Sequence, residues 1–194
     1  MIDPSKVTNF NRNAFELQEW ALFCFAAAGK SSFTIAPRLE NLLREGREKG
    51  YSPFDWVGML IDCDALIQKL KKFGLGQFKR TQRCWSEMIK HPELPYKWGL
   101  DDLLSIHGIG NKTARFFMLH SRPNQKVAVL DVHILHWLRD QGYDQVPKIA
   151  PGSIRIYKYW ESIFLYECAL KYRDVAELDL EIWNHYSKKV KVSA

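Results

Sequence analysis

Residues 103–135 read LLSIHGIGNKTARFFMLHSRPNQKVAVLDVHIL. In this stretch Gly108 and Gly110 enclose an isoleucine between two short segments of helical apolar spacing, residues 103–106 and 114–118. Glycine adopts backbone conformations that other residues avoid, so the pattern predicts a tight hairpin between two short helices. The N–H groups at the start of the second helix, together with the positive end of its dipole, would bind a phosphate group.

A lysine and an aspartate follow this turn. Lys112 lies two residues after Gly110, and Asp131 ends the apolar segment 127–130. A lysine amine is a nucleophile only when it is neutral, and partial burial and a helix N-terminus both favour the neutral form. A nearby carboxylate can take up the proton or stabilise a developing positive charge. Taken singly, Lys112 could be a phosphate contact and Asp131 an ordinary helix N-cap, but their combination favours catalysis.

These motifs resemble those of a known family. Residues 103–118 resemble the helix-hairpin-helix motif, and residues 127–133, VAVLDVH, resemble the loop and aspartate of the endonuclease III superfamily of DNA glycosylases (HhH-GPD). The resemblance implies a bifunctional glycosylase and abasic-site lyase of base excision repair. Lys112 would attack C1′ and form a Schiff base, Asp131 would assist, and β-elimination would nick the strand. The resemblance implies no metal and no cofactor for this chemistry.

The same resemblance, together with the charge pattern, suggests how DNA would be bound. The net charge is +6, and basic residues gather at 69–83 and after the hairpin, where Lys112 and Arg115 lie. Such an excess suits a polyanion, although a solvated surface could carry it as well. Gln77 follows a glycine pair where relatives place a wedge in the opposite strand. The predicted DNA contacts are Gly108, Ile109, Gly110, Asn111, His133, Gln77, Lys79 and Arg80.

The substrate is predicted from two further segments. Residues 25–32, FAAAGKSS, lack the glutamine typical of the pyrimidine-specific and adenine-specific branches. Residues 178–183, LDLEIW, resemble the acidic-aromatic helix of cluster-free archaeal and bacterial 8-oxoguanine DNA glycosylases. We therefore predict excision of 8-oxoguanine, with Lys30, Ser31 and Trp183 at the base pocket. The alternatives are an oxidised pyrimidine or alkylated base as substrate, or a non-catalytic helix-hairpin-helix module that binds DNA only.

Composition limits the class of protein. The 194 residues are 46% hydrophobic and 13% aromatic, which favours a folded core over disorder. The apolar run 20–28 is too short to span a membrane, so we expect an intracellular protein. The resemblance implies a monomer that binds damaged double-stranded DNA. The four cysteines are far apart, which predicts buried thiols rather than a zinc site, a disulfide framework or an iron–sulfur cluster.

Helical spacing of apolar residues recurs along the chain, and strand alternation is confined to residues 126–130, so the predicted fold is all-α. Pro92 and Pro95 predict a loop before the hairpin. The resemblance implies two helical lobes with a DNA-binding cleft, placed at 30–118 and at 1–29 with 119–194. Helices are expected at 14–28, 36–48, 64–73, 78–89, 131–139, 153–172 and 175–185, with a short one starting at Pro53.

Overall fold

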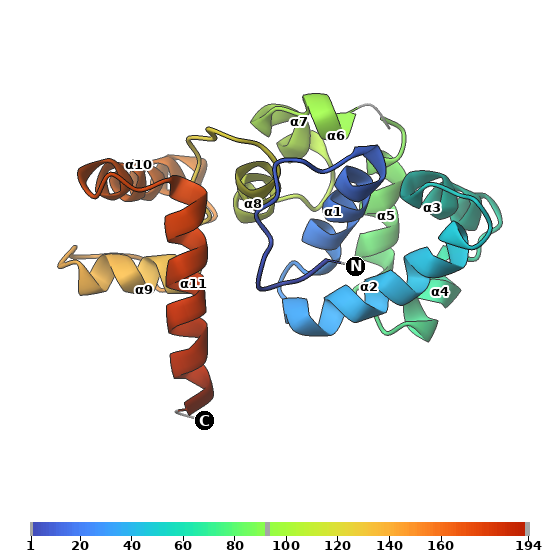
Figure 1. Ribbon diagram of the computed structural model, residues 1–194, viewed down its shortest axis with the longest axis horizontal. Coiled ribbons are helices and arrows are strands. Elements are labelled where there is room, and N and C mark those ends of the chain that lie inside the picture. The colour runs from blue at the N-terminus through green and yellow to red at the C-terminus, as the bar shows by residue number, and fades with distance from the viewer. Residues whose placement is uncertain (1, 92–93, 193–194) are drawn as a thin grey trace. The chain divides into compact units, whose positions relative to one another are not determined.

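The computed structural model describes residues 2–91 and 94–192, and over these residues the chain is helical with no β-strand. This confirms the predicted all-α class. The chain divides into two compact units, Met1–Gly110 and Asn111–Ala194. Figure 1 follows the helices from the N-terminus to the C-terminus. The segment 126–130, which alone had strand-like alternation, forms neither a helix nor a strand.

The first unit is built around one apolar helix. Helix α1 begins with a capping box, in which the Asn13 side chain accepts from the Glu16 N–H and the Glu16 carboxylate accepts from the Asn13 N–H. It contacts α2, α3, α5 and α6, which accounts for the burial of residues 20–26 on all sides of the helix. The helices of this unit are α1 (Ala14–Ala26), α2 (Ser32–Arg47), α3 (Pro53–Asp62), α4 (Leu66–Lys72), α5 (Phe78–Met88), α6 (Leu94–Lys97) and α7 (Leu100–Ser105).

Three of the differences from the predicted helices exceed two residues. Helix α2 starts four residues early, because the Ser31 carbonyl accepts from the N–H groups of Thr34 and Ile35. The predicted loop near Pro95 contains the single turn α6, since proline is compatible with the first turn of a helix. In the second unit, α11 (Val175–Val192) runs past the predicted end at residue 185, where no glycine or proline interrupts it.

The second unit consists of α8 (Asn111–Ser121), α9 (Val132–Asp140), α10 (Ile154–Leu170) and α11. Helix α11 contacts the other three. The segment between α8 and α9 also belongs to the core, because Ala128 and Leu130 are fully buried. The segment that leads into Asp131 is therefore anchored in the core. The buried core residues are Ala128, Leu130, Ile134, Leu135, Leu138, Val146, Tyr157, Trp160, Phe164, Cys168, Leu178, Ile182 and Tyr186.

These units differ from the predicted lobes. Residues 1–29 lie in the first unit, because α1 packs against α2, α3, α5 and α6. Residues 111–118 lie in the second unit, with the rest of α8. The predicted lobes rest on the resemblance to known glycosylases, which this division into compact units does not test, so the lobe division stays a prediction.

Two predictions about side chains need correction. Cys63 is exposed, because it caps the end of α3, whereas Cys24, Cys84 and Cys168 are buried as predicted. Burial raises the pKa of all three buried thiols, to about 12 for Cys168.

None of the helices in the described part of the chain is long and apolar enough to cross a membrane. Residues 2–91 and 94–192 contain no group of three or more potential metal ligands.

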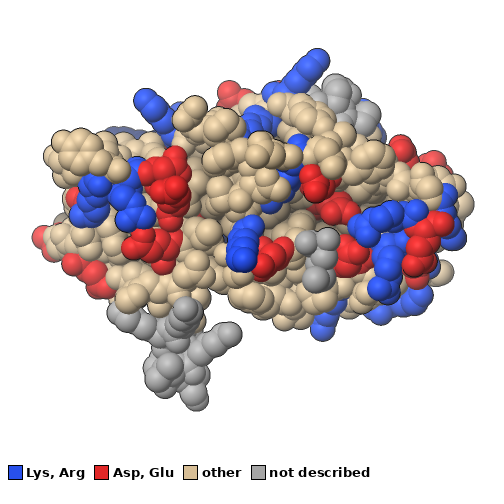
Figure 2. Space-filling view, in the orientation of Figure 1, with Lys and Arg blue, Asp and Glu red and all other residues tan. Residues whose placement is uncertain are grey.

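The second correction concerns the basic residues. Lys69 and Lys72 both pair with Glu45, and Arg83 pairs with Glu87, so part of the predicted basic cluster is neutralised locally. Figure 2 shows Lys and Arg side chains next to Asp and Glu on the visible face rather than in one continuous basic surface. The basic residues of this face are therefore interspersed with acidic ones.

Candidate active site

The turn before α8 has the geometry that its glycines require. Gly108 has a φ of +84°, a conformation that L residues rarely adopt, and an added Cβ would lie 3.2 Å from Arg80 Nε. Gly110 has open space around the position of a Cβ. The first N–H groups of a helix have no acceptor within the helix, so the start of α8 can bind an anion. Lys112 is the second residue of α8.

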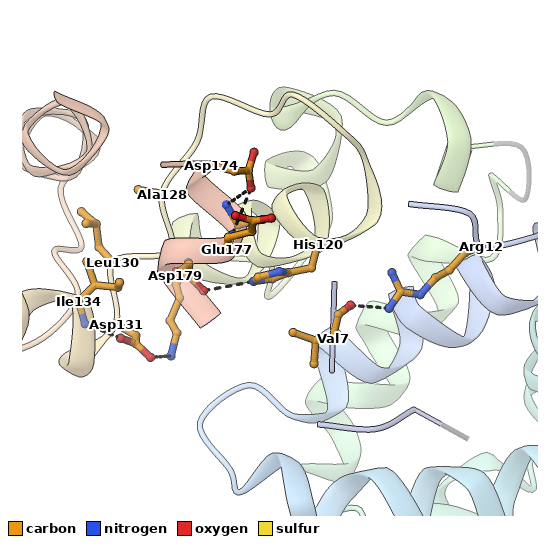
Figure 3. Close-up of polar contacts among 12 residues, drawn as sticks. Val7, Arg12, His120, Ala128, Leu130, Asp131, Ile134, Asp174, Glu177 and Asp179 are labelled. Atoms are coloured by element: carbon orange, nitrogen blue, oxygen red, sulfur yellow. Dashed lines mark hydrogen bonds and ion pairs between the residues drawn. The ribbon is translucent and has the colours of Figure 1, made fainter. Parts of the chain in front are cut away.

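Asp131 caps α9 and faces Lys112 at the same time. Its Oδ1 accepts hydrogen bonds from the N–H groups of His133 at 2.8 Å and Ile134 at 2.9 Å. Its Oδ2 lies 3.9 Å from Lys112 Nζ (Figure 3). The Asp131 side chain is 11% exposed, whereas that of Lys112 is 50% exposed. The carboxylate is thus held rigidly by the backbone, and the amine beside it is accessible from solvent.

The chain before Asp131 is held by α10. The Tyr157 hydroxyl donates to the Ala128 carbonyl at 2.9 Å and accepts from the Leu130 N–H at 3.0 Å. Glu161 Oε1 accepts from the Ala128 N–H at 2.9 Å. Burial raises the pKa of the Tyr157 hydroxyl, which keeps it protonated and able to donate. Both backbone groups of Ala128 are therefore satisfied by side chains of one helix.

Glu161 also binds Arg115, one turn after Lys112 on α8. The guanidinium donates from Nε to Oε1 at 2.6 Å and from Nη2 to Oε2 at 3.0 Å, and its side chain is fully buried. It also donates to the Asn111 side-chain oxygen at 3.1 Å. Arg115 is thus a buried structural residue, which corrects its assignment to a basic DNA-facing cluster. The Asn111 side-chain oxygen thus already accepts from Arg115. The backbone N–H of Asn111, at the start of α8, is the group of this residue that could contact DNA.

A second buried pair lies in the same unit. His120 Nε2 is 3.2 Å from Asp179 Oδ2, and both side chains are buried (Figure 3). Burial raises the pKa of the Asp179 carboxyl, and the contact with His120 opposes this rise. The charge of Asp179 also interacts with Asp131 and Lys112. Its Oδ1 atom is buried without a hydrogen-bond partner among the described residues.

His133 and Trp183 are brought together. Their ring centroids are 6.3 Å apart in an edge-to-face arrangement. Both side chains are half-buried. The His133 backbone N–H donates to Asp131, so its ring places Trp183 in the same part of the second unit as the carboxylate.

The predicted contacts of the first unit form a separate group. Arg80 donates from Nη1 to Gln77 Oε1 at 2.8 Å and from Nη2 to the Gly108 carbonyl at 2.9 Å. Gln77 is exposed and has a φ of +49°. Lys79 is exposed on the first turn of α5. Arg80 therefore links the predicted wedge residue to the glycine turn.

Lys30 and Ser31, the two residues predicted at the base pocket in this unit, lie between α1 and α2. Lys30 Nζ donates to the Ala26 carbonyl at 2.9 Å and to the Leu75 carbonyl at 2.6 Å. Burial lowers the pKa of Lys30, and the charge of Arg80 adds to this effect. Ser31 is exposed and precedes α2 without a side-chain capping bond. Lys30 thus joins the end of α1 to the loop at Leu75.

Comparison with known proteins supports the fold. No protein-family model matches the sequence. Two solved structures of the 8-oxoguanine DNA glycosylase of Methanocaldococcus jannaschii are similar, both at 21% sequence identity. One was crystallised with 15mer DNA containing 8-oxoguanine and has a TM-score of 0.69, with 92% of this chain and 84% of that chain covered. The other has a TM-score of 0.70 and covers 94% and 84%. The chain shares the fold of this glycosylase.

The sequence does not predict the residues that hold Lys112 and Asp131 in place. Glu161 and Tyr157 were assigned only to a helix, and His120 and Asp179 were not paired. Asp179 lies 59 residues from His120, and Glu161 lies 46 residues from Arg115, so no local spacing connects them. The available signal was a pair of acidic residues, Glu161 and Glu167, at positions that helical spacing places on the buried side of α10.

Proposed function

We propose that this protein is a DNA glycosylase with abasic-site lyase activity that excises 8-oxoguanine from double-stranded DNA as a monomer. The observation that carries the proposal is the Lys112 amine, accessible at the start of a helix and 3.9 Å from a buried, backbone-held carboxylate oxygen of Asp131. An amine nucleophile and a fixed carboxylate are the two groups that Schiff-base excision needs. The shared fold with a glycosylase crystallised on 8-oxoguanine DNA supports this substrate.

The proposed reaction starts with a damaged nucleotide rotated out of the duplex. Neutral Lys112 attacks C1′ through Nζ, the N-glycosidic bond breaks, and the base leaves with the bonding electron pair and takes up a proton. Asp131 accepts the proton that the attacking amine loses and stabilises positive charge at C1′. Opening of the sugar gives a Schiff base on Lys112. Loss of a C2′ proton then expels the 3′ phosphate and nicks the strand.

The remaining predicted contacts have roles that fit their surroundings. The N–H groups of Gly108, Gly110 and Asn111 and the His133 ring would bind phosphates of the damaged strand, whereas the Ile109 N–H donates to the Ile106 carbonyl at 3.1 Å. Trp183 would stack on the extruded base, because aromatic faces and bases stack well. In the first unit, Gln77 is the proposed wedge, Arg80 supports it, and Lys79 contacts phosphate. The assignment of Lys30 and Ser31 to the base pocket rests on the sequence alone and stays a prediction.

An excision assay tests the proposal. Duplexes with single lesions, namely 8-oxoguanine, an oxidised pyrimidine, an alkylated base and an abasic site, are incubated with the protein and with Lys112→Gln. We expect release of 8-oxoguanine and a nick at its position, both lost in the variant while duplex binding remains. Excision of a different lesion would overturn the substrate. Binding without cleavage of any duplex would mean that the hairpin serves DNA binding alone.

A further inference from the structure

Residues 126–130, which lead into the candidate carboxylate of Asp131, lack the regular backbone hydrogen bonds of a helix or strand. Residues 126–130 form neither a helix nor a strand, so their buried backbone groups need partners elsewhere. Ala128 and Leu130 are both fully buried. The partners come from α10: the Tyr157 hydroxyl contacts the Ala128 carbonyl and the Leu130 N–H, and Glu161 accepts from the Ala128 N–H.

The same two α10 side chains also hold the helix that carries the candidate nucleophile. Glu161 forms a two-point pair with Arg115, which lies three residues after Lys112 on α8. The Arg115 Cζ lies 4.4 Å from the centroid of the Tyr157 ring, in a cation–π contact. Arg115 also reaches back to Asn111, the first residue of α8, through its carbonyl and side-chain oxygens. Tyr157 and Glu161 thus contact both segments.

We propose that Tyr157 and Glu161 are positioning residues, which set the distance between the Lys112 amine and the Asp131 carboxylate by fastening α8 and the segment before α9 to one helix. This inference rests on the proposed function. In this inference, neither Tyr157 nor Glu161 contacts the substrate. A rigid separation matters because a displacement of about 1 Å at reacting groups can slow a reaction on the order of 100-fold.

The Tyr157→Phe variant is the sharpest test. It removes the hydroxyl, with its bonds to Ala128 and Leu130, and keeps the ring over Arg115. Tyr143→Phe is the matched control, because it also removes one tyrosine hydroxyl from the second unit. That hydroxyl donates to Glu167 Oε1 at 2.7 Å and has no contact with the segment before Asp131.

Three measurements are made on the wild type and both variants. These are single-turnover excision of 8-oxoguanine at saturating protein, the Kd for a duplex with an uncleavable abasic analogue, and amide exchange at Leu130 by NMR. We expect Tyr157→Phe to speed Leu130 exchange and to slow excision by on the order of 10-fold to 100-fold, with an unchanged Kd. Tyr143→Phe should match the wild type in all three.

The outcomes separate this proposal from the function on which it rests. If Tyr157→Phe exchanges faster at Leu130 yet excises at the wild-type rate, the positioning role is wrong. An equal loss of excision in both tyrosine variants would also contradict it, since a general loss of stability would then be the cause. A wild-type protein that excises nothing would instead overturn the proposed function. If Tyr157→Phe does not fold at the assay temperature, all three proteins are compared at a lower temperature at which circular dichroism shows it folded, with the same expected split between excision rate and Kd.

Discussion

Asp131 combines two duties that are usually assigned to different residues. One carboxylate oxygen caps α9, and the other faces Lys112. The capping bonds fix the side chain, so no rearrangement is needed to present Oδ2 to the amine. An ordinary capping aspartate and a catalytic one are therefore not exclusive alternatives at this position.

Asparagine separates the two duties. It caps helices about as well as aspartate, so Asp131→Asn should change the free energy of unfolding by less than about 0.5 kcal/mol. Since it cannot accept a proton, it should slow excision on the order of 100-fold or more. The matched control is Asp174→Asn, because Asp174 caps α11 in the same way, accepting from the N–H groups of Ala176 and Glu177. Equal excision rates in the two variants would contradict a chemical role for Asp131.

Arg115 illustrates how burial changes the meaning of a basic residue. Its guanidinium is fully buried against Glu161, and removing one partner of such a pair leaves a charge without compensation. Arg115→Met should therefore lower the free energy of unfolding by about 3–5 kcal/mol, measured by urea denaturation. The urea midpoint of Arg155→Met, a substitution of an exposed arginine on the first turn of α10, should stay near that of the wild type.

At the scale of the elements, the hairpin turn makes different demands on its two glycines. Gly108→Ala would force an L residue to a φ of +84° and push its Cβ toward Arg80, which should cost about 1–2 kcal/mol in unfolding free energy. Gly110→Ala has open space and should leave the thermal midpoint unchanged. Its methyl group would still stand where a phosphate approaches, so it should weaken duplex binding. A Gly110→Ala protein that binds the duplex with wild-type affinity would contradict phosphate binding at this turn.

The turn is also held by Glu87 of α5, which accepts from the His107 N–H at 2.6 Å. This hydrogen bond, more than the nearby Arg83, lowers the pKa of the Glu87 carboxyl. Because its pKa is lowered in the folded protein, the ionised Glu87 carboxylate stabilises the fold at pH values above the usual pKa of a glutamate. This stabilisation is lost as the pH falls through the lowered pKa. Wild-type protein should therefore lose more stability than Glu87→Gln between about pH 6 and pH 3, measured as Tm. Parallel Tm curves would exclude this contribution.

For the whole molecule, net charge is a poor guide to where DNA binds. Lys69 is paired with Glu45, whereas Lys79 is exposed at the start of α5. Lys79→Ala should reduce the slope of log Kd against log salt concentration by about 1, as expected for one lost phosphate contact. Lys69→Ala should leave the slope unchanged. A reduced slope in Lys69→Ala would mean that its pairing with Glu45 opens on DNA.

The sequence predicts the parts of this protein that depend on neighbouring residues. The glycine turn, the lysine after it and the capping aspartate are local signals, and the helical spacing of apolar residues identifies most helices. The hydrogen bonds around the site join residues far apart in the chain, such as Arg115 with Glu161 and His120 with Asp179. Burial of a charged side chain has no local signature, which is why Arg115 was assigned to the surface.

Borohydride trapping tests the central claim most directly, because reduction converts a Schiff base into a permanent covalent bond between protein and DNA. The wild-type protein is incubated with 8-oxoguanine duplex and borohydride, and the adduct is digested and sequenced by mass spectrometry. The account predicts a DNA-linked peptide modified at Lys112, and no adduct from Lys112→Gln. An adduct on any other lysine, or none from a wild-type protein that still releases the base, would contradict it.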